Sequence, residues 1–380
     1  MILEKSSQCN IGGRAGTKIF YNNKIAIGAG VGRKDQDKLL YLLLIELGFS
    51  EYEITENQIT INYAKSMDLY KINENEIIKI IDQMIKIFEL NKNKYSNMTF
   101  KNFAIKIIGK KMYEKFKLSL GYTDYENQDV NEVLYHYGIK DNVQSWKSFN
   151  VPWSKLISKL YKYIGLENFV FSSEVVEINK NDEIHNVMTI DGKNYKCKKI
   201  IIASTIDTIR NLLPTRSIYS NIEGQNFMRV YAKFDDKSIP IMKKYIKGLT
   251  YVNSPLQKII PINPNDGIYM IAYNDNFNAS LLMKYQENTK QNRHLYELLL
   301  VESLKISNEK IKILTLQSYY WNIGTHYYKP FDHKIFNYDK FIYEAQHPEP
   351  NILVVGECVS RNQGWTEGAL ESVENIKIDI

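Results

Sequence analysis

The chain has 380 residues, of which 44% are hydrophobic and 24% charged, and this balance excludes a disordered or fibrous protein. Its 49 Lys and Arg against 43 Asp and Glu give a formal net charge of +6 without a basic block, so nucleic acid is not an expected partner. Three widely separated cysteines, Cys9, Cys197 and Cys358, argue against disulfides and against a metal site, and favour a reducing, cytoplasmic location.

The opening residues, MILEKSSQCN, lack the apolar core of a signal peptide. No later stretch approaches the roughly 18 apolar residues of a membrane span. A helix over 35–47 is expected next, with Asp35 as its N-cap and Gly48 just beyond its end. Its leucines recur with helical spacing and form one apolar face.

Short β-branched runs and Asn or Gly turns predict strands along the rest of the chain. The expected strands are 2–4, 18–21, 24–27, 169–171, 175–178, 187–190, 200–203, 229–234, 267–273 and 352–355. Residues 77–160 have a helical pattern, and further helices are expected over 293–306 and from Trp365 onward.

The first motif is LEKSSQCNIGGRAGT, residues 3–17. A carboxylate at a strand end, here Glu4, can accept hydrogen bonds from both hydroxyls of a ribose. Gly12 and Gly13 let the backbone approach a pyrophosphate, and Arg14 can neutralise its charge. The alternative is a glycine-rich surface turn.

The second motif is KIAIGAGVGRKDQDKLL, residues 24–40. A strand, GAGVGR and a helix resemble the dinucleotide fingerprint, but the G-x-G-x-x-G spacing places Arg33 where the third glycine belongs. Arginine cannot replace a glycine that lets strand and helix pack closely. A small-residue turn beside a ligand is the better interpretation.

The third motif is NILVVGECVSRNQGWTEGALES, residues 351–372. A buried strand leads to Gly356-Glu357, a short loop and Gly-Trp-Thr-Glu-Gly-Ala. Backbone amides at the N-terminus of the helix that follows can stabilise negative charge on a ligand.

These three segments, in this order, resemble the flavin-containing amine oxidase family, whose superfamily includes monoamine and polyamine oxidases, protoporphyrinogen oxidase and phytoene desaturase. The resemblance covers the chain from Ile2 to about Asn375 and implies FAD as cofactor, with Val175 on the adenine side. The residues implied to contact FAD are Glu4, Gly12, Gly13, Arg14, Gly28, Ala29, Gly30, Val31, Arg33, Val175, Glu357, Trp365 and Thr366.

The resemblance also implies catalytic residues. Amine oxidases often place a lysine that holds a water by the flavin where this chain has Arg229, with Lys233 as a second candidate, and the departure bears on reoxidation by dioxygen. Tyr327 and Trp365 would form the two walls of an aromatic slot for the amine. His326 can contact the flavin or be a core residue.

The family normally precedes Glu4 with a strand, a G-x-G-x-x-G loop and a helix, and the given sequence starts after them. Removing that strand would leave two neighbouring strands unpaired and take away the main pyrophosphate site. Either Met1 is an internal methionine of a longer reading frame, or the chain is a remnant that binds flavin weakly or not at all.

The expected fold is α/β, with a Rossmann-like FAD-binding domain, truncated at its first strand, interleaved with an α+β substrate domain. The FAD-binding domain would comprise 1–70, 151–215 and 331–380, and the substrate domain 71–150 and 216–330. The sequence does not indicate an oligomeric state.

The expected function is an FAD-dependent oxidoreductase that oxidises a small-molecule amine by hydride transfer to the flavin, with dioxygen as acceptor. A desaturase or isomerase of the same superfamily is one alternative. A non-catalytic remnant that acts as a binding or scaffold protein is the other.

Overall fold

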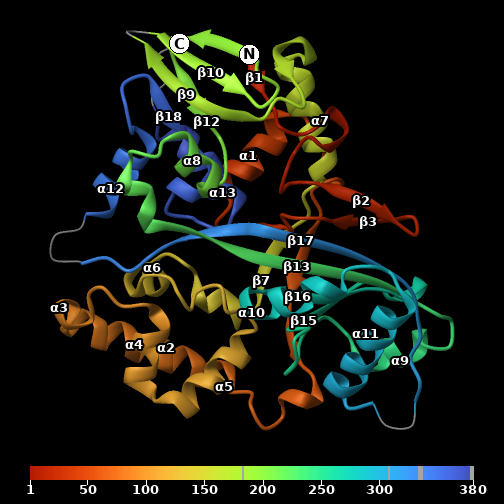
Figure 1. Ribbon diagram of the computed structural model, residues 1–380. Coiled ribbons are helices and arrows are strands. Elements are labelled where there is room, and N and C mark those ends of the chain that lie inside the picture. The colour runs from red at the N-terminus through yellow and green to blue at the C-terminus, as the bar shows by residue number, and fades with distance from the viewer. Residues whose placement is uncertain (182–183, 307–308, 333–336, 377–380) are drawn as a thin grey trace.

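The computed structural model describes residues 1–181, 184–306, 309–332 and 337–376. Two long antiparallel strands, β13 (Ile222–Phe234) and β17 (Ile313–Tyr328), cross the middle of the molecule and separate an upper from a lower part (Figure 1).

β13 and β17 belong to a six-stranded sheet of order β17-β13-β16-β15-β14-β6, antiparallel except for the parallel pair of β14 and β6. The other strands are β6 (Ile61–Tyr63), β14 (Leu249–Tyr251), β15 (Lys258–Asn263) and β16 (Ile268–Asp275). Most residues of β13 are buried, and α9 (Ile239–Tyr245), α10 (Asn276–Leu282) and α11 (Lys290–Leu304) cover the sheet below. This apolar packing makes β13 the centre of the largest core.

The helices of the lower left in Figure 1 form a second core. They are α2 (Glu74–Leu90), α3 (Lys92–Tyr95), α4 (Phe100–Ile108), α5 (Lys110–Leu120) and α6 (Val130–Tyr135). α2 shows why this region is helical: the Asn73 side chain accepts a hydrogen bond from Glu76 N, and buried apolar residues follow at helical spacing from Ile77 to Phe88.

The upper part holds two separate pairs of parallel strands and a meander. β1 (Ile2–Leu3) pairs with β8 (Phe169–Val170), and β12 (Ile200–Ile202) pairs with β18 (Ile352–Val354). The meander is β9 (Val175–Asn181), β10 (Ile184–Thr189) and β11 (Asn194–Cys197). The helices here are α1 (Lys38–Glu46), α7 (Trp153–Ile164), α8 (Ile206–Leu212), α12 (Tyr338–Gln346) and α13 (Thr366–Glu374).

Most of the predicted strands are confirmed, including the hairpin of β2 (Thr17–Phe20) and β3 (Asn23–Ala26). The helical prediction over 77–160 is wrong at β7 (Trp146–Phe149), which pairs with β4 (Gly32–Arg33) and β5 (Glu56–Ile59). The prediction that Asp35 is the N-cap of the first helix is also wrong, because α1 begins at Lys38 and its N-cap position is Asp37. The molecule is thus a mixed helix and sheet protein with parallel and antiparallel strands, as the α/β expectation requires at this coarse level.

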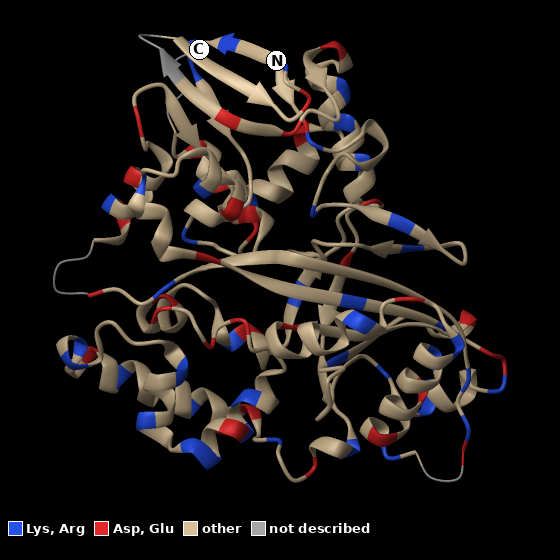
Figure 2. Ribbon diagram, viewed as in Figure 1, with Lys and Arg blue, Asp and Glu red and all other residues tan. Residues whose placement is uncertain are grey.

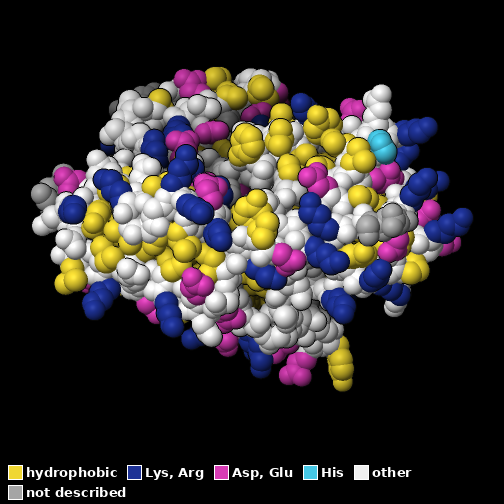
Figure 3. Space-filling model, turned by 90° about the horizontal axis from the view of Figure 1, so that it is seen from below, with side chains coloured by type: hydrophobic (Ala, Val, Ile, Leu, Met, Phe, Trp, Pro, Cys, Tyr) yellow, Lys and Arg dark blue, Asp and Glu magenta, His cyan; other side chains and the backbone are white. Residues whose placement is uncertain are grey.

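Lys and Arg are interspersed with Asp and Glu along the ribbon in Figure 2, and Figure 3 shows both signs of charge mixed on the face seen from below. In the part of the chain that the structure describes, no helix has both the length and the apolar character needed to cross a bilayer.

Candidate functional site

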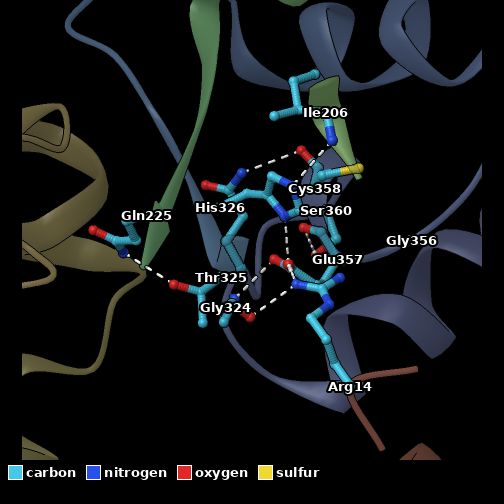
Figure 4. Close-up of polar contacts among 12 residues, drawn as sticks. Arg14, Ile206, Gln225, Gly324, Thr325, His326, Gly356, Glu357, Cys358 and Ser360 are labelled. Atoms are coloured by element: carbon cyan, nitrogen blue, oxygen red, sulfur yellow. Dashed lines mark hydrogen bonds and ion pairs between the residues drawn. The ribbon is translucent and has the colours of Figure 1, made fainter. Parts of the chain in front are cut away.

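Arg14, His326 and Glu357 meet in a buried cluster where segments far apart in the sequence converge (Figure 4). Arg14 Nη1 donates to Glu357 Oε1 at 2.8 Å and to the carbonyl of Gly324 at 2.8 Å. His326 Nδ1 lies 2.5 Å from the same carboxylate oxygen, while Gly364 N donates to the other oxygen at 3.0 Å. The carboxylate therefore joins the first loop, β17 and the closing segment.

Burial opposes ionisation of Glu357, but the His326 ring and the Arg14 guanidinium outweigh it and hold the pKa of this carboxyl well below its ordinary value. Ile206 N donates to His326 Nε2 at 3.1 Å, so both ring nitrogens have partners. Arg14 keeps further N–H donors, and its side chain is 31% exposed.

The turn between β3 and β4, residues 27–31, is the second part of the site. Two neighbours donate to its carbonyl groups, Trp321 Nε1 to Ile27 O at 2.8 Å and Trp153 Nε1 to Gly30 O at 2.9 Å, and Arg229 Nη1 donates at 3.3 Å to Ala26 O at the end of β3. The turn also packs on the first loop, since Ala29 N donates to Arg14 O at 2.7 Å. A Cβ at position 28 would overlap that carbonyl oxygen, so only glycine fits there.

Trp153 and Trp321 contact this turn directly, and the other two tryptophans, Trp365 and Trp146, lie beside Arg33, which follows the turn in β4. The Arg33 guanidinium lies 3.8 Å from the centre of the Trp365 ring, and Trp146 meets Trp365 edge to face at 6.4 Å. Arg33 is held in place by Asp37, whose Oδ1 accepts from Arg33 Nε at 2.9 Å and from Arg33 Nη2 at 2.7 Å. Arg33, the residue that breaks the G-x-G-x-x-G spacing of the second motif, thus stacks on Trp365 of the third motif.

Several backbone N–H groups at the site have no acceptor among the residues that the structure describes. In the turn they are those of Gly28, Gly30 and Val31, and at the start of α13 those of Thr366 and Glu367. Such groups can donate to an anionic or carbonyl-bearing ligand. They are the features of this chain that best fit the polar edge of a flavin.

The other predicted FAD contacts are dispersed around the upper part. Glu4 Oε1 accepts a hydrogen bond from Ser6 N at 2.7 Å, and within the described ranges the second oxygen of Glu4 receives none. Val175 begins β9, an edge strand that pairs with β10 on one side and has no strand partner on the other among the described residues. Gly12 and Gly13 form the loop that presents Arg14, both with positive φ.

The predicted catalytic residues are only partly brought together. Arg229 lies beside the turn, with a Cβ at Gly30 falling 3.4 Å from Arg229 Nη2, and its guanidinium is 4.6 Å from the centre of the Tyr273 ring. No ring contact joins Tyr327 to Trp365 within the described residues. Tyr327 instead lines a separate cleft with Glu223 and Asn276.

Sequence reasoning missed Glu367, a buried residue whose two carboxylate oxygens accept hydrogen bonds from Leu39 N and Leu40 N at 2.8 and 2.9 Å. It also missed Trp153 and Trp321 as partners of the turn. From the sequence, Glu367 is expected in the first turn of the predicted closing helix, where a carboxylate is favourable. Nothing in the neighbouring sequence indicates that it caps a different helix.

No protein-family model matches this chain, and no curated protein matches its sequence. Among solved structures, putrescine oxidase in a double mutant from a redesign of its cofactor binding superposes with a TM-score of 0.73 at 12% identity, covering 97% of this chain and 90% of that one. Wild-type putrescine oxidase bound to putrescine gives a TM-score of 0.71 at the same identity and coverage. The chain therefore shares the fold of putrescine oxidase over nearly its whole length.

Proposed function

We propose that this protein is an FAD-dependent oxidoreductase that oxidises a small amine. The observation that carries the proposal is that Arg14 and the 27–33 segment meet the closing segment before α13, which lies more than 300 residues later in the sequence. The shared fold with putrescine oxidase supports the same class.

In this proposal the segments 1–70, 151–215 and 331–380 hold the cofactor, and 71–150 and 216–330 form the substrate side. Glu4 offers a free carboxylate oxygen to ribose hydroxyls, and the β9 edge at Val175 offers backbone groups to adenine. The N–H groups of the turn and of α13 that lack an acceptor within the described residues would donate to electron-rich atoms of the ring system. Bound FAD supplies the hydride acceptor that oxidation of a C–N bond needs.

The protein's own part is binding, orientation and exclusion of water. The Trp365 ring, fixed between Arg33 and Trp146, provides a rigid aromatic wall. Arg229 is buried beneath the turn and is fixed by Ala26 O, so it adds a permanent positive charge there. A cation at this place favours build-up of negative charge on a neighbouring group.

A titration with FAD tests the cofactor. Because Trp153 and Trp321 bond to the turn and Trp365 stacks on Arg33 next to it, FAD bound there should quench tryptophan fluorescence in a saturable way, acquire a protein-bound visible spectrum and raise the Tm. The Trp365→Ala variant should bind FAD about tenfold more weakly through loss of one aromatic contact. The matched control, Tyr163→Ala on exposed α7, should bind FAD as the parent does.

Amine oxidation is tested separately with the FAD-loaded protein and putrescine. Two electrons leave the amine, dioxygen takes them up, and hydrogen peroxide should appear in proportion to the amine consumed. Flavin reduction by putrescine without peroxide would indicate another electron acceptor. Stable FAD binding with no reaction towards amines would favour the desaturase or isomerase.

A non-catalytic binding protein is the second candidate, and one observation favours it. Both oxygens of Glu357 are used inside the protein, by Arg14 and His326 on one side and by Gly364 N on the other. A carboxylate so engaged serves the fold rather than a ligand. A protein that FAD neither colours nor stabilises against heat would establish this candidate and end the oxidoreductase proposal.

A further inference from the structure

A polar cleft of about 480 Å³ lies beside β13 and β17, where α8 and α10 meet these strands. Its volume is in the range of sites that hold a small molecule. Figure 4 shows Gln225, which lines the cleft, at the opposite end of the drawn residues from Arg14, so the cleft is separate from the cluster around Glu357. Most of the polar lining consists of carboxamides, which are those of Asn127, Gln225, Asn226, Asn276 and Asn322.

Two of these carboxamides use their N–H donors within the protein and keep a free acceptor. Asn226 Nδ2 donates to Ser280 Oγ at 2.7 Å and to the Tyr320 hydroxyl at 2.8 Å. Asn276 Nδ2 donates to Thr123 O at 3.1 Å. Neither Oδ1 atom receives a hydrogen bond from the described residues, so both side chains offer an acceptor to a ligand.

Other lining groups keep donors as well. The carboxamides of Asn127 and Asn322 are exposed and make no hydrogen bond in the part of the chain that the structure describes, so each can donate and accept. Tyr327 is only 9% exposed, yet its hydroxyl has no partner within the described ranges, although a mostly buried tyrosine usually finds one. The cleft therefore presents donors and acceptors side by side.

The charged groups at the cleft are already paired with one another. Arg210 lies 3.2 Å from Glu223 and 3.6 Å from Asp207. Lys329 lies 3.5 Å from Glu223. Burial opposes ionisation of Glu223, but Arg210 and Lys329 prevail and hold the pKa of this carboxyl below its ordinary value. Two carboxylates and two cations balance, so the cleft favours a neutral ligand over an ion.

One aromatic ring at the cleft is open to a ligand. Phe277, in the first turn of α10, is 76% exposed and is part of the cleft lining. The C–H groups on one face of a pyranose ring form an apolar surface that can cover such a ring and remove both from water. A carboxamide lining with one exposed ring matches a ligand that has hydroxyl groups at its edge and C–H groups on its face.

We infer that the cleft binds a neutral carbohydrate of the size of a pyranose sugar. Each hydroxyl of a sugar donates and accepts, which matches the mixture of Asn322, Tyr327 and the free Oδ1 of Asn226. An apolar ligand would leave these polar groups without partners. The inference goes beyond the proposed oxidoreductase and does not rest on it, because it uses no residue of the 27–31 turn, the first loop or the closing segment.

Saturation-transfer NMR on the full chain tests the inference, with the methyl glycosides of glucose, galactose and mannose as probes. At least one of them should receive saturable transfer, with and without FAD, concentrated on the protons of one ring face because that face lies on Phe277. Glycerol, which has hydroxyl groups but no ring face, should not displace the glycoside.

Variants locate the binding in the cleft. Phe277→Ala should weaken glycoside binding about tenfold through loss of the aromatic contact, and Phe277→Trp, which keeps a ring, should restore it. Asn322→Ala removes a donor and an acceptor and should weaken binding several-fold. The matched controls, Tyr52→Ala and Asn194→Ala at exposed positions outside the cleft, should bind as the parent does.

The inference is overturned if none of the three glycosides receives saturable transfer, if glycerol competes as well as a glycoside does, or if Phe277→Ala and Asn322→Ala both bind like the parent. Both cleft variants should keep the parental FAD titration. Glycoside binding without FAD binding would defeat the proposed function alone, and FAD binding without glycoside binding would defeat this inference alone.

Discussion

Glu357 shows how one side chain can define the centre of this fold. Its carboxylate is 8% exposed and bonds to partners from the first loop, β17 and the closing segment. A buried charge of this kind is destabilising unless its partners are in place, so the cluster forms only when both ends of the chain have folded together.

Stability in acid should depend on Glu357. Because its folded pKa is lowered, its contribution is complete above the unfolded pKa of about 4.3 and is lost as pH falls from there towards the folded pKa. The free energy of unfolding should fall by at most about 1.4 kcal/mol per pH unit from this group. Urea unfolding of Glu357→Gln should show a weaker acid dependence and, at pH 7, a loss of about 3 kcal/mol or more.

The matched variant is Glu344→Gln, which removes an exposed carboxylate paired with Lys340 and should change the unfolding free energy by at most about 1 kcal/mol. Equal acid profiles for Glu357→Gln and the parent protein would show that the cluster does not hold the charge assigned to it.

Lys258 is the other residue with a clear pH signature. It is fully buried, donates to Gly121 O at 2.9 Å and places its amine 2.9 Å from the centre of the Tyr122 ring. Burial lowers the pKa of Lys258 to about 7, although Asp275 and Asp124 act in the opposite direction. Between that value and the ordinary pKa, the unfolded state binds a proton that the folded state lacks, so stability rises with pH.

Replacing Lys258 with Met should therefore remove a rise of about 1 kcal/mol per pH unit in the unfolding free energy between about pH 7 and pH 10. Chemical denaturation at several pH values measures the slope. Lys71→Met, at an exposed ion pair with Asp68, should keep the parent slope. A Lys258→Met protein with an unchanged slope would mean that this amine is protonated throughout.

At the scale of elements, α1 is fixed by a carboxylate from the other end of the chain. Glu367, in the first turn of α13, accepts from Leu39 N and Leu40 N, which are orphan donors of the α1 N-terminus. Asp37, which precedes α1, cannot take this role because its carboxylate is engaged by Arg33. The contact ties two helices that both border the candidate site.

Glu367→Ala should cost about 2 kcal/mol of unfolding free energy, the upper range for loss of a helix cap. Hydrogen exchange should accelerate at the Leu39 and Leu40 amides before it does in α2. Glu46→Ala, at the exposed C-terminal end of α1, serves as control and should be neutral or slightly stabilising, since a carboxylate is unfavourable there. Unchanged exchange at Leu39 and Leu40 in Glu367→Ala would exclude the capping role.

Elements built from local signals were predictable from the sequence. The β2–β3 hairpin follows from an Asn-Asn turn between alternating residues, and the closing strand and helix follow from a buried run and a glycine turn. The cap of α1 and the tryptophan partners of the turn were not predictable, because their hydrogen bonds span more than 100 residues and leave no local pattern. β7 was missed because its pairing with β4 and β5 overrides a helical surrounding.

For the molecule as a whole, the sequence order of the motifs was the informative signal. Segments near residues 14, 28 and 357 converge as the family resemblance implies, and the overall fold is that of putrescine oxidase. The position of the Tyr327 side chain was the least predictable part. It depends on which face of the sheet the side chain leaves from, and the long pairing of β13 with β17 is irregular. The division into an FAD-binding and a substrate domain stays a proposal.

Asp129 connects the helical region to the rest of the molecule and allows this large-scale organisation to be tested. Fully buried before α6, it accepts from Asn131 N at 2.9 Å, from Phe331 N at 3.0 Å and from the Tyr338 hydroxyl at 2.7 Å. Two of these donors lie after β17, so the carboxylate joins the core of α2–α6 to the segment that leads into α12.

Asp129→Ala should therefore lower the unfolding free energy by about 3–5 kcal/mol, because at least three donors, among them the buried Phe331 N and Tyr338 hydroxyl, lose their acceptor together. Asp129→Asn keeps one acceptor oxygen and should recover part of that loss, whereas Asp82→Ala, at the exposed pair with Lys140, should be nearly neutral. Urea unfolding followed by both circular dichroism and tryptophan fluorescence adds a second readout, since the four tryptophans lie outside the core of α2–α6 whereas the dichroism reports on the helices. If the two transitions separate in Asp129→Ala but not in the other variants, this carboxylate is the link that makes the two regions unfold together. Coincident transitions and a parental unfolding free energy in Asp129→Ala would refute that role.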